Sequence, residues 1–177
     1  MSQLSALLMR GLGVPKNFTE GLKWLIRAAQ SGNHHALMNL GMLFEQGEGM
    51  PRDYAEAKKL YMIAASKGNP LAMYNLAEMY YHGRGESVNH SEAWKFYIAA
   101  GHAGFPQGWL KVADMYAAGQ GVQQDYAKAM EYYRKAAEAG HPEAMERIGR
   151  MYEKGLGVPK DKAEAKKWYS MARSQGR

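Results

Sequence analysis

The chain has no cysteine among its 177 residues, which excludes disulfide bonds and thiolate metal sites. It also has no run approaching the 18 apolar residues of a membrane-spanning helix. The start, Met1-Ser2-Gln3-Leu4-Ser5, lacks the basic leader and apolar stretch of a secretory signal. We therefore expect a soluble, cytoplasmic chain with no membrane span. A periplasmic or secreted location would require a targeting segment removed ahead of position 1.

Valine and isoleucine are scarce, so the apolar fraction of 46% rests mainly on alanine, leucine, methionine and tyrosine. Alanine, leucine and methionine favour helix, whereas β-branched residues favour strand. An apolar fraction of this size is normal for a folded chain and does not indicate disorder. The composition predicts an all-α protein with almost no sheet.

A Gly-x-Gly turn recurs five times, and each copy begins 36 residues after the previous one. The copies begin at Gly11, Gly47, Gly83, Gly119 and Gly155. A constant period of this length indicates a solenoid built from one repeated unit. We divide the single array 1–177 into an incomplete first repeat, 1–34, and four complete repeats, 35–70, 71–106, 107–142 and 143–177.

Each repeat contains two helical patterns separated by the Gly-x-Gly turn. In the second repeat, apolar residues recur at helical spacing from about His35 to Gln46. The second helix of each repeat follows an Asn or Asp suited to N-capping, and it ends at a glycine. The N-caps are Asn17, Asp53, Asn89, Asp125 and Asp161, and the closing glycines are Gly32, Gly68, Gly104, Gly140 and Gly176. The predicted fold is a right-handed α/α superhelix of helix-turn-helix repeats.

The second repeat contains the pattern Ala36-x-x-x-Leu40-Gly41-x-x-Phe44-x-x-Gly47-x-Gly49, then Asp53-Tyr54-x-x-Ala57, then Tyr61-x-x-Ala64-Ala65-x-x-Gly68. This pattern resembles the Sel-1-like repeat, a longer-period relative of the tetratricopeptide repeat. The resemblance covers the whole chain and implies an adaptor or scaffold that binds proteins, with no shared enzymatic activity. The third repeat departs from the pattern at Glu86 and Gly101, so we expect the middle of the array to be looser or specialised.

No catalytic, cofactor or metal site is predicted. The Gly-x-Gly turns follow no strand and have no Gly-Lys context, so we interpret them as structural joints that do not touch a ligand. Among the six histidines only His34 and His35 are close in sequence, and adjacent residues at a helix start point to different sides. No Ser-x-x-Lys occurs to supply a nucleophile and its base.

The exposed face of the first helix in each repeat is the predicted binding surface, because in tetratricopeptide-type solenoids this face lines the concave groove. One position per repeat forms a ladder that changes from amide to cation: Asn39, Asn75, Lys111 and Arg147. Beside it the predicted inner face presents Met38, Met42, Tyr74, Glu78, Tyr81, His82, Leu110 and Asp114. Amides can clamp a peptide backbone, and the cations can take an acidic side chain or a C-terminal carboxylate. The alternative is that the asparagines bond locally between repeats.

The predicted function is a protein-interaction adaptor that holds a protein or peptide in this groove. One version is an inhibitor or immunity-type partner of a bacterial effector. An RNA-binding helical repeat is the competing class, because the net charge is +6 and the pI is about 9.4. The excess lies at the ends, with four Lys or Arg against one Glu over 1–34 and nine against five over 143–177. Since no continuous basic stripe results, nucleic acid is disfavoured.

Neither end of the array carries an obvious polar capping helix. Terminal repeats of solenoids need a polar outer face to stay soluble. We therefore expect the ends either to continue into a longer array or to be covered by partners or by self-association.

Overall fold

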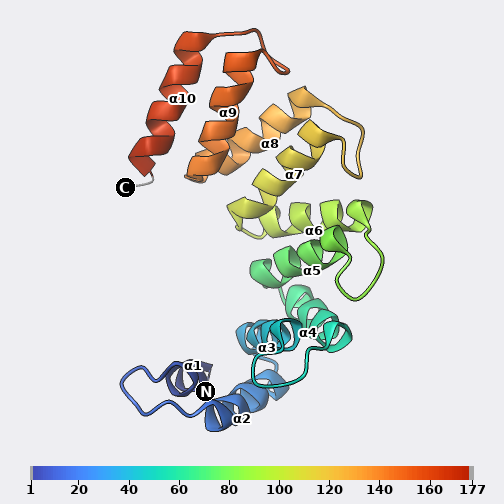
Figure 1. The fold of residues 1–177 in the computed structure, drawn as a ribbon, viewed down its shortest axis with the longest axis vertical. Helices are drawn as coiled ribbons and strands as arrows, with labels where there is room; N and C mark the ends of the chain where they lie inside the picture. The colour runs from blue at the N-terminus through green and yellow to red at the C-terminus, as the bar shows by residue number, and fades with distance from the viewer. Residues whose placement is uncertain (1, 176–177) are drawn as a thin grey trace. The chain divides into compact units, whose positions relative to one another are not determined.

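The computed structural model describes residues 2–175, with side chains from residue 3 onward. Ten α-helices and no β-strand form this part of the chain (Figure 1). The helices are α1 Ser2–Arg10, α2 Phe18–Gln30, α3 His34–Gln46, α4 Tyr54–Ser66, α5 Pro70–His82, α6 His90–His102, α7 Pro106–Ala118, α8 Tyr126–Glu138, α9 Pro142–Lys154 and α10 Lys162–Gln175. The predicted all-α class and the repeated helical pairs are confirmed. The closing glycine predicted at Gly176 lies outside the described residues.

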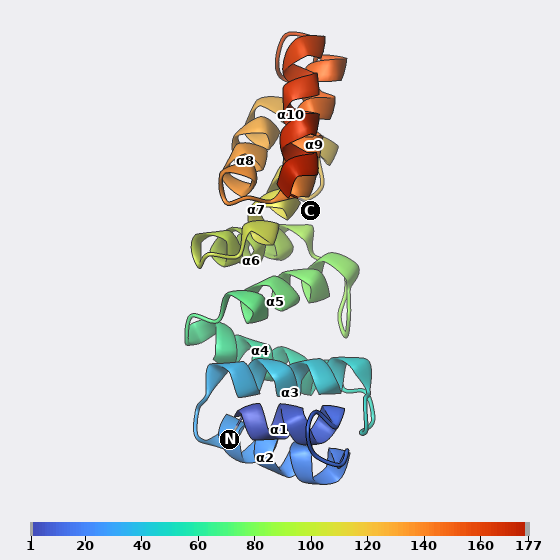
Figure 2. The same cartoon turned by 90° about the vertical axis from the view of Figure 1, so that its left-hand side faces the viewer.

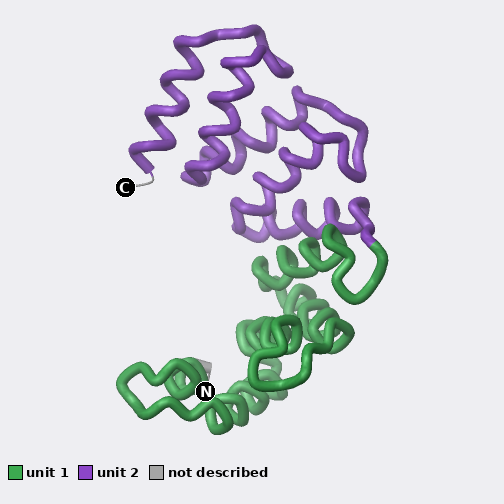
Figure 3. The backbone as a smooth tube through the Cα atoms, viewed as in Figure 1, with its two compact units in different colours: residues 1–87 green, residues 88–177 purple. Residues whose placement is uncertain are grey.

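The chain forms two compact units, Met1–Ser87 and Val88–Arg177 (Figure 3). The first unit contains the hairpins α1/α2 and α3/α4, followed by α5. The second contains α6, followed by the hairpins α7/α8 and α9/α10. Within each hairpin the two helices lie side by side and are joined at one end by a Gly-x-Gly loop, as α9 and α10 show in Figures 1 and 2.

All five predicted N-caps of the second helices are present. In each, the side-chain oxygen of the Asn or Asp accepts a hydrogen bond from the backbone N–H three residues on, at 3.0–3.1 Å. Such a bond satisfies one of the N–H groups that a helix start leaves without a partner. These caps depend on a few neighbouring residues only, which is why the sequence revealed them.

The two glycines of the turn have different roles. The first closes the first helix in the left-handed region, as at Gly47 with φ 71°. The second also lies against the first residue of the second helix one repeat earlier: a Cβ at Gly85 would come within 2.6 Å of the Tyr54 Cβ. A larger residue would therefore push successive hairpins apart as well as straining the backbone.

The third repeat is not loosened at the two departures from the pattern. The ring of Trp109 packs directly over Gly101 and is only 9% exposed, so a large side chain fills the space left by the missing one. Glu86 accepts a hydrogen bond from Lys58 Nζ at 2.6 Å. Both departures are matched by a compensating contact, and the middle of the chain is specialised at these residues.

Candidate partner-binding groove

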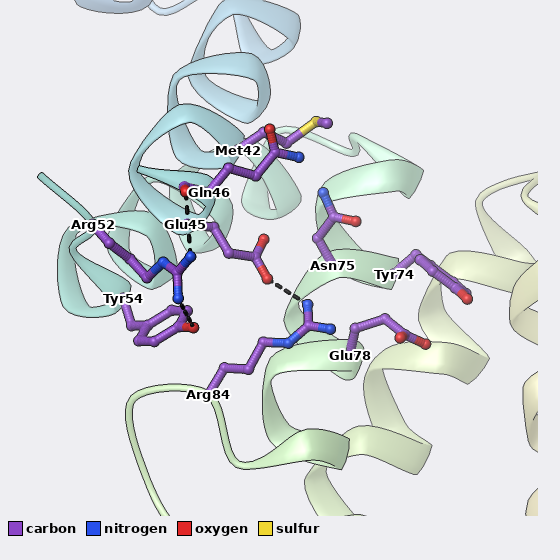
Figure 4. A pocket seen from close by; sticks show the side chains of 9 residues that line it. All are labelled: Met42, Glu45, Gln46, Arg52, Tyr54, Tyr74, Asn75, Glu78 and Arg84. Carbon is purple, nitrogen blue, oxygen red and sulfur yellow. Dashed lines mark hydrogen bonds and ion pairs between the residues drawn. The ribbon is translucent and has the colours of Figure 1, made fainter. Parts of the chain in front are cut away.

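A cavity of about 550 Å³ lies in the first unit, between the C-terminal half of α3, the loop that precedes α4, and α5 (Figure 4). Its lining residues are Met42, Glu45, Gln46, Arg52, Tyr54, Tyr74, Asn75, Glu78 and Arg84. A second cavity of about 210 Å³ is lined by Ser5, Ala6, Met9, Arg10, Leu25, Asn39, Met42, Leu43, Gln46 and Glu48. Because both cavities share Met42 and Gln46, they adjoin along α3. We call the pair the α3 groove.

Glu45 is the centre of the polar network in this groove. Its carboxylate accepts a hydrogen bond from Arg84 Nη1 at 2.6 Å (Figure 4). It also accepts one from the Tyr61 hydroxyl at 2.7 Å. Burial and the bond to this carboxylate raise the pKa of the Tyr61 hydroxyl far above its ordinary value. Burial acts to lower the pKa of Arg84, but the hydrogen bond to Glu45 and the nearby negative charges of Glu45 and Glu78 together outweigh it, so the pKa of Arg84 rises. The network holds the Arg84 guanidinium in place, and the Glu45 carboxylate balances its positive charge.

Two cations of the α3 groove, Arg10 and Arg52, have no acidic partner within the described part of the chain, and Arg52 lines the larger cavity. Its guanidinium makes only long bonds, from Nη1 to the Tyr54 hydroxyl at 3.4 Å and from Nη2 to the Gln46 carbonyl at 3.5 Å (Figure 4). A guanidinium can form two parallel hydrogen bonds to one carboxylate. Arg52 is therefore placed to receive a carboxylate from outside the chain.

Five of the predicted contact residues line the α3 groove: Asn39, Asn75, Met42, Tyr74 and Glu78. His82 lies nearby, with Nε2 3.3 Å from a Glu78 oxygen, and its ring meets the edge of the Tyr81 ring. The exposure expected for Met38 and Leu110 is wrong. These side chains are 7% and 2% exposed because both turn into the helix packing.

Lys111, Asp114 and Arg147 belong to the second unit, whereas Asn39 and Asn75 belong to the first. Arg147 is held by two carboxylates of its own unit, at 3.6 Å from Asp114 and 3.0 Å from Glu143. Asp114 also accepts the Tyr133 hydroxyl at 2.6 Å. An incoming acidic group would have to displace these contacts, so Arg147 is less suited than Arg52 to bind one.

The sequence interpretation missed Glu45, Gln46, Arg52, Tyr54 and Arg84. Arg84 is the middle residue of the third Gly-x-Gly turn, so one of these turns contributes a side chain to the candidate groove. A signal was present, because the middle residues are Leu12, Glu48, Arg84, Gln120 and Leu156. The two charged members of this series, Glu48 and Arg84, both line the α3 groove.

The buried tyrosines predict a stability loss at alkaline pH. Tyr61 and Tyr133 are 0% and 3% exposed, and their pKa values are raised by burial and by hydrogen bonds to Glu45 and Asp114. Folding thus favours the neutral phenol. The stabilisation is complete below the unfolded pKa of about 10 and falls above it by about 1.4 kcal/mol per pH unit for each tyrosine.

Urea unfolding from pH 8 to 11.5 measures this loss. The double variant Tyr61→Phe/Tyr133→Phe should be less stable at pH 8 but should lose less stability as the pH rises. Parallel pH profiles for the two proteins would contradict the assignment to these tyrosines.

In the described part of the chain, no three His, Asp or Glu side chains are grouped so that they could hold a metal ion. Within residues 2–175, no helix has both the length and the apolar character needed to cross a membrane.

A sequence model of the Sel1 repeat matches residues 1–33, 34–69, 70–105, 110–141 and 142–176. The chain is similar to the crystal structure of a protective antigen with an SLR fold from uropathogenic Escherichia coli strains. The TM-score is 0.92 at 37% identity, over 98% of this chain and 37% of that one. A Sel1 repeat protein from Oxalobacter formigenes gives a TM-score of 0.89 at 31% identity, over 99% of this chain and 70% of that one.

An immunity protein from Pseudomonas aeruginosa gives a TM-score of 0.53 at 18% identity, over 98% of this chain and 80% of that one. At this identity the likeness shows the fold alone. No curated protein matches the chain.

Proposed function

Because the chain belongs to the Sel1 repeat family, we propose that it is a protein-binding scaffold whose α3 groove holds a carboxylate-bearing segment of a partner. Sel1 repeat proteins typically serve as protein-interaction scaffolds and are generally non-enzymatic. The chain spans 37% of the length of the Escherichia coli relative, so the partner is argued from the groove alone. The observation that carries the proposal is the guanidinium of Arg52, which lines the groove without an acidic partner in the described chain.

The lining supplies three kinds of contact. Arg52 pairs with an acidic side chain or a C-terminal carboxylate of the segment. Asn39 and Asn75 offer amide donors and acceptors to its backbone, one from each cavity. Met42 and Tyr74 contact its apolar side chains, and a flexible thioether adapts to different shapes. Since Glu45 already holds Arg84, the groove is organised before the segment arrives, which lowers the ordering cost of binding.

Peptide selection tests this function. Random peptides with free C-termini are selected on the intact chain, and those selected should carry a terminal or side-chain carboxylate. Arg52→Ala should weaken their binding by about 10–100-fold, as expected for a charge-assisted bond worth about 1.5–3 kcal/mol. Lys67→Ala, on an exposed lysine of the same unit, should change the affinity by less than about twofold. Peptides that bind both variants equally would refute the role of Arg52.

An inhibitor or immunity-type role stays a prediction. Two immunity proteins of Pseudomonas aeruginosa share the fold at 18% and 19% identity, which does not extend to their partners. The α3 groove is compatible with that role, and the identity of the bound protein would decide it.

A further inference from the structure

One surface of α10, the second helix of the last repeat, differs in composition from the same surface of the earlier second helices. In the earlier repeats, one face of the second helix receives the following hairpin. The second glycine of each later Gly-x-Gly turn lies against the first residue of that helix: Gly49 on Phe18, Gly85 on Tyr54, Gly121 on His90 and Gly157 on Tyr126. The same face of α10 is therefore the equivalent of this packing face in the earlier helices.

Three positions on this face are all Lys or Arg in α10, whereas each earlier second helix has at most one Lys or Arg at them. Lys162 stands where the earlier helices have Phe18, Tyr54, His90 and Tyr126. Lys166 stands where they have Leu22, Lys58, Trp94 and Met130. Arg173 stands where they have Ala29, Ala65, Gly101 and Ala137. This face of α10 is thus more basic than the same face of the earlier second helices.

These cations line a cavity of about 400 Å³ together with Glu153, Ala165 and Tyr169. Glu153, the one acidic member of the lining, already accepts the Tyr169 hydroxyl at 3.0 Å. Lys162, Lys166 and Arg173 form no ion pair with any described residue. The neighbouring Lys167, by contrast, lies 2.7 Å from Glu164. Three unpaired cations and a small apolar floor at Ala165 therefore face the same cavity.

We propose that this α10 face binds an acidic segment of another protein. At the one earlier Lys on this face, Lys58, the following repeat supplies a carboxylate, Glu86, at 2.6 Å. An apolar partner surface would instead bury three cations without counter-charges, which is strongly unfavourable. A second copy fits no better through its first helix, whose exposed Leu4 and Leu7 would meet lysines. Carboxylates on the partner would pair with the cations, and a small side chain would cover Ala165.

The spacing defines the length of the segment. Residues 162, 166 and 173 span 11 positions, or about 16 Å at 1.5 Å per helical residue. An acidic helix of four turns covers this distance. A nucleic acid is disfavoured because Glu153 would repel phosphates and because the cations end within one helix instead of forming a longer stripe.

Fluorescence anisotropy tests the proposal with an 18-residue peptide of alanine and glutamate, with Glu at positions 3, 7, 10, 14 and 17. We expect saturable binding at 50 mM NaCl that weakens with added salt. The triple variant Lys162→Glu/Lys166→Glu/Arg173→Glu should weaken binding at least tenfold.

The matched control is Lys16→Glu/Lys67→Glu/Lys154→Glu, which makes the same change in net charge at exposed lysines elsewhere. Circular dichroism checks that both triple variants fold. Equal losses in the two would mean non-specific attraction and would overturn the proposal, as would an absence of saturable binding. Tighter binding of a poly-uridine RNA that is lost in the α10 variant would overturn it in favour of a nucleic-acid surface.

Discussion

Gly108→Ala should destabilise the protein by about 3 kcal/mol, although the change adds only one methyl group and improves helix propensity. The other repeats carry alanine at this position: Ala36, Ala72 and Ala144. At residue 108, however, the added Cβ would collide with the Tyr97 carbonyl oxygen and lie 2.7 Å from the Gly101 backbone nitrogen. Backbone atoms cannot rotate away as a side chain can, so α6 and α7 would have to separate.

Separation of these helices would also remove the contact between Trp109 and Gly101, which depends on their close approach. For a chain of this length, a loss of about 3 kcal/mol lowers the melting temperature by about 6–12 °C. Calorimetry of the purified variant measures this directly.

Gly140→Ala is the matched control, since this glycine has φ 83° but no atom near its missing Cβ. It should cost only the left-handed backbone strain, about 1–2 kcal/mol. If Gly108→Ala lowers the stability no more than Gly140→Ala does, then α6 and α7 do not approach as closely at Gly108 as described.

Glu45→Ala should cost about 2–4 kcal/mol and should also weaken partner binding in the α3 groove. The side chain is only 13% exposed, and it accepts charge-assisted bonds from Arg84 and from the fully buried Tyr61. Bonds of this kind contribute about 1.5–3 kcal/mol, and an orphaned buried hydroxyl adds a desolvation cost. Arg84 would lose the carboxylate that holds it in the groove lining.

Urea unfolding measures the stability change, and a double-mutant cycle isolates its cause. In a Tyr61→Phe background the cost of Glu45→Ala should fall by about 1–2 kcal/mol, because no hydroxyl is left without an acceptor. If the two substitutions lower the free energy of unfolding by additive amounts, Glu45 and Tyr61 are not coupled.

Glu153→Ala provides the comparison at the equivalent position of the last repeat. Its bond to the Tyr169 hydroxyl is 3.0 Å and exposed, so we expect a loss below about 1 kcal/mol. The difference between the Glu45→Ala and Glu153→Ala losses measures how much burial adds to a tyrosine–carboxylate hydrogen bond.

The tyrosine partners show why the site could not be predicted in full. Tyr61 and Tyr133 occupy equivalent positions in their repeats, yet their hydroxyls bond to carboxylates at different positions. Tyr61 bonds to Glu45, whereas Tyr133 bonds to Asp114, which lies three positions before the residue equivalent to Glu45. At the equivalent small-residue position of the first helix, Gly41 lies under the Tyr61 ring, whereas the fourth repeat has Ala113. Only the packed structure shows which carboxylate each ring reaches.

The sequence by itself determined the helices, their ends and the 36-residue period. An Asn or Asp cap, a left-handed glycine and an apolar spacing act within one or two helical turns, so they can be recognised from neighbouring residues. Asn39, Asn75 and Met42, which the sequence predicts on the exposed face of the first helices, line the α3 groove.

Tertiary structure alone decided which charges are available to a partner. Arg84 meets Glu45 across 39 residues, and Arg147 meets Asp114 across 33. These pairs form because successive hairpins pack together, which brings distant side chains within reach in a way that a repeat alignment cannot specify. The same packing buried Met38 and Leu110, engaged Arg147, and left Arg52 and the three cations of α10 unpaired.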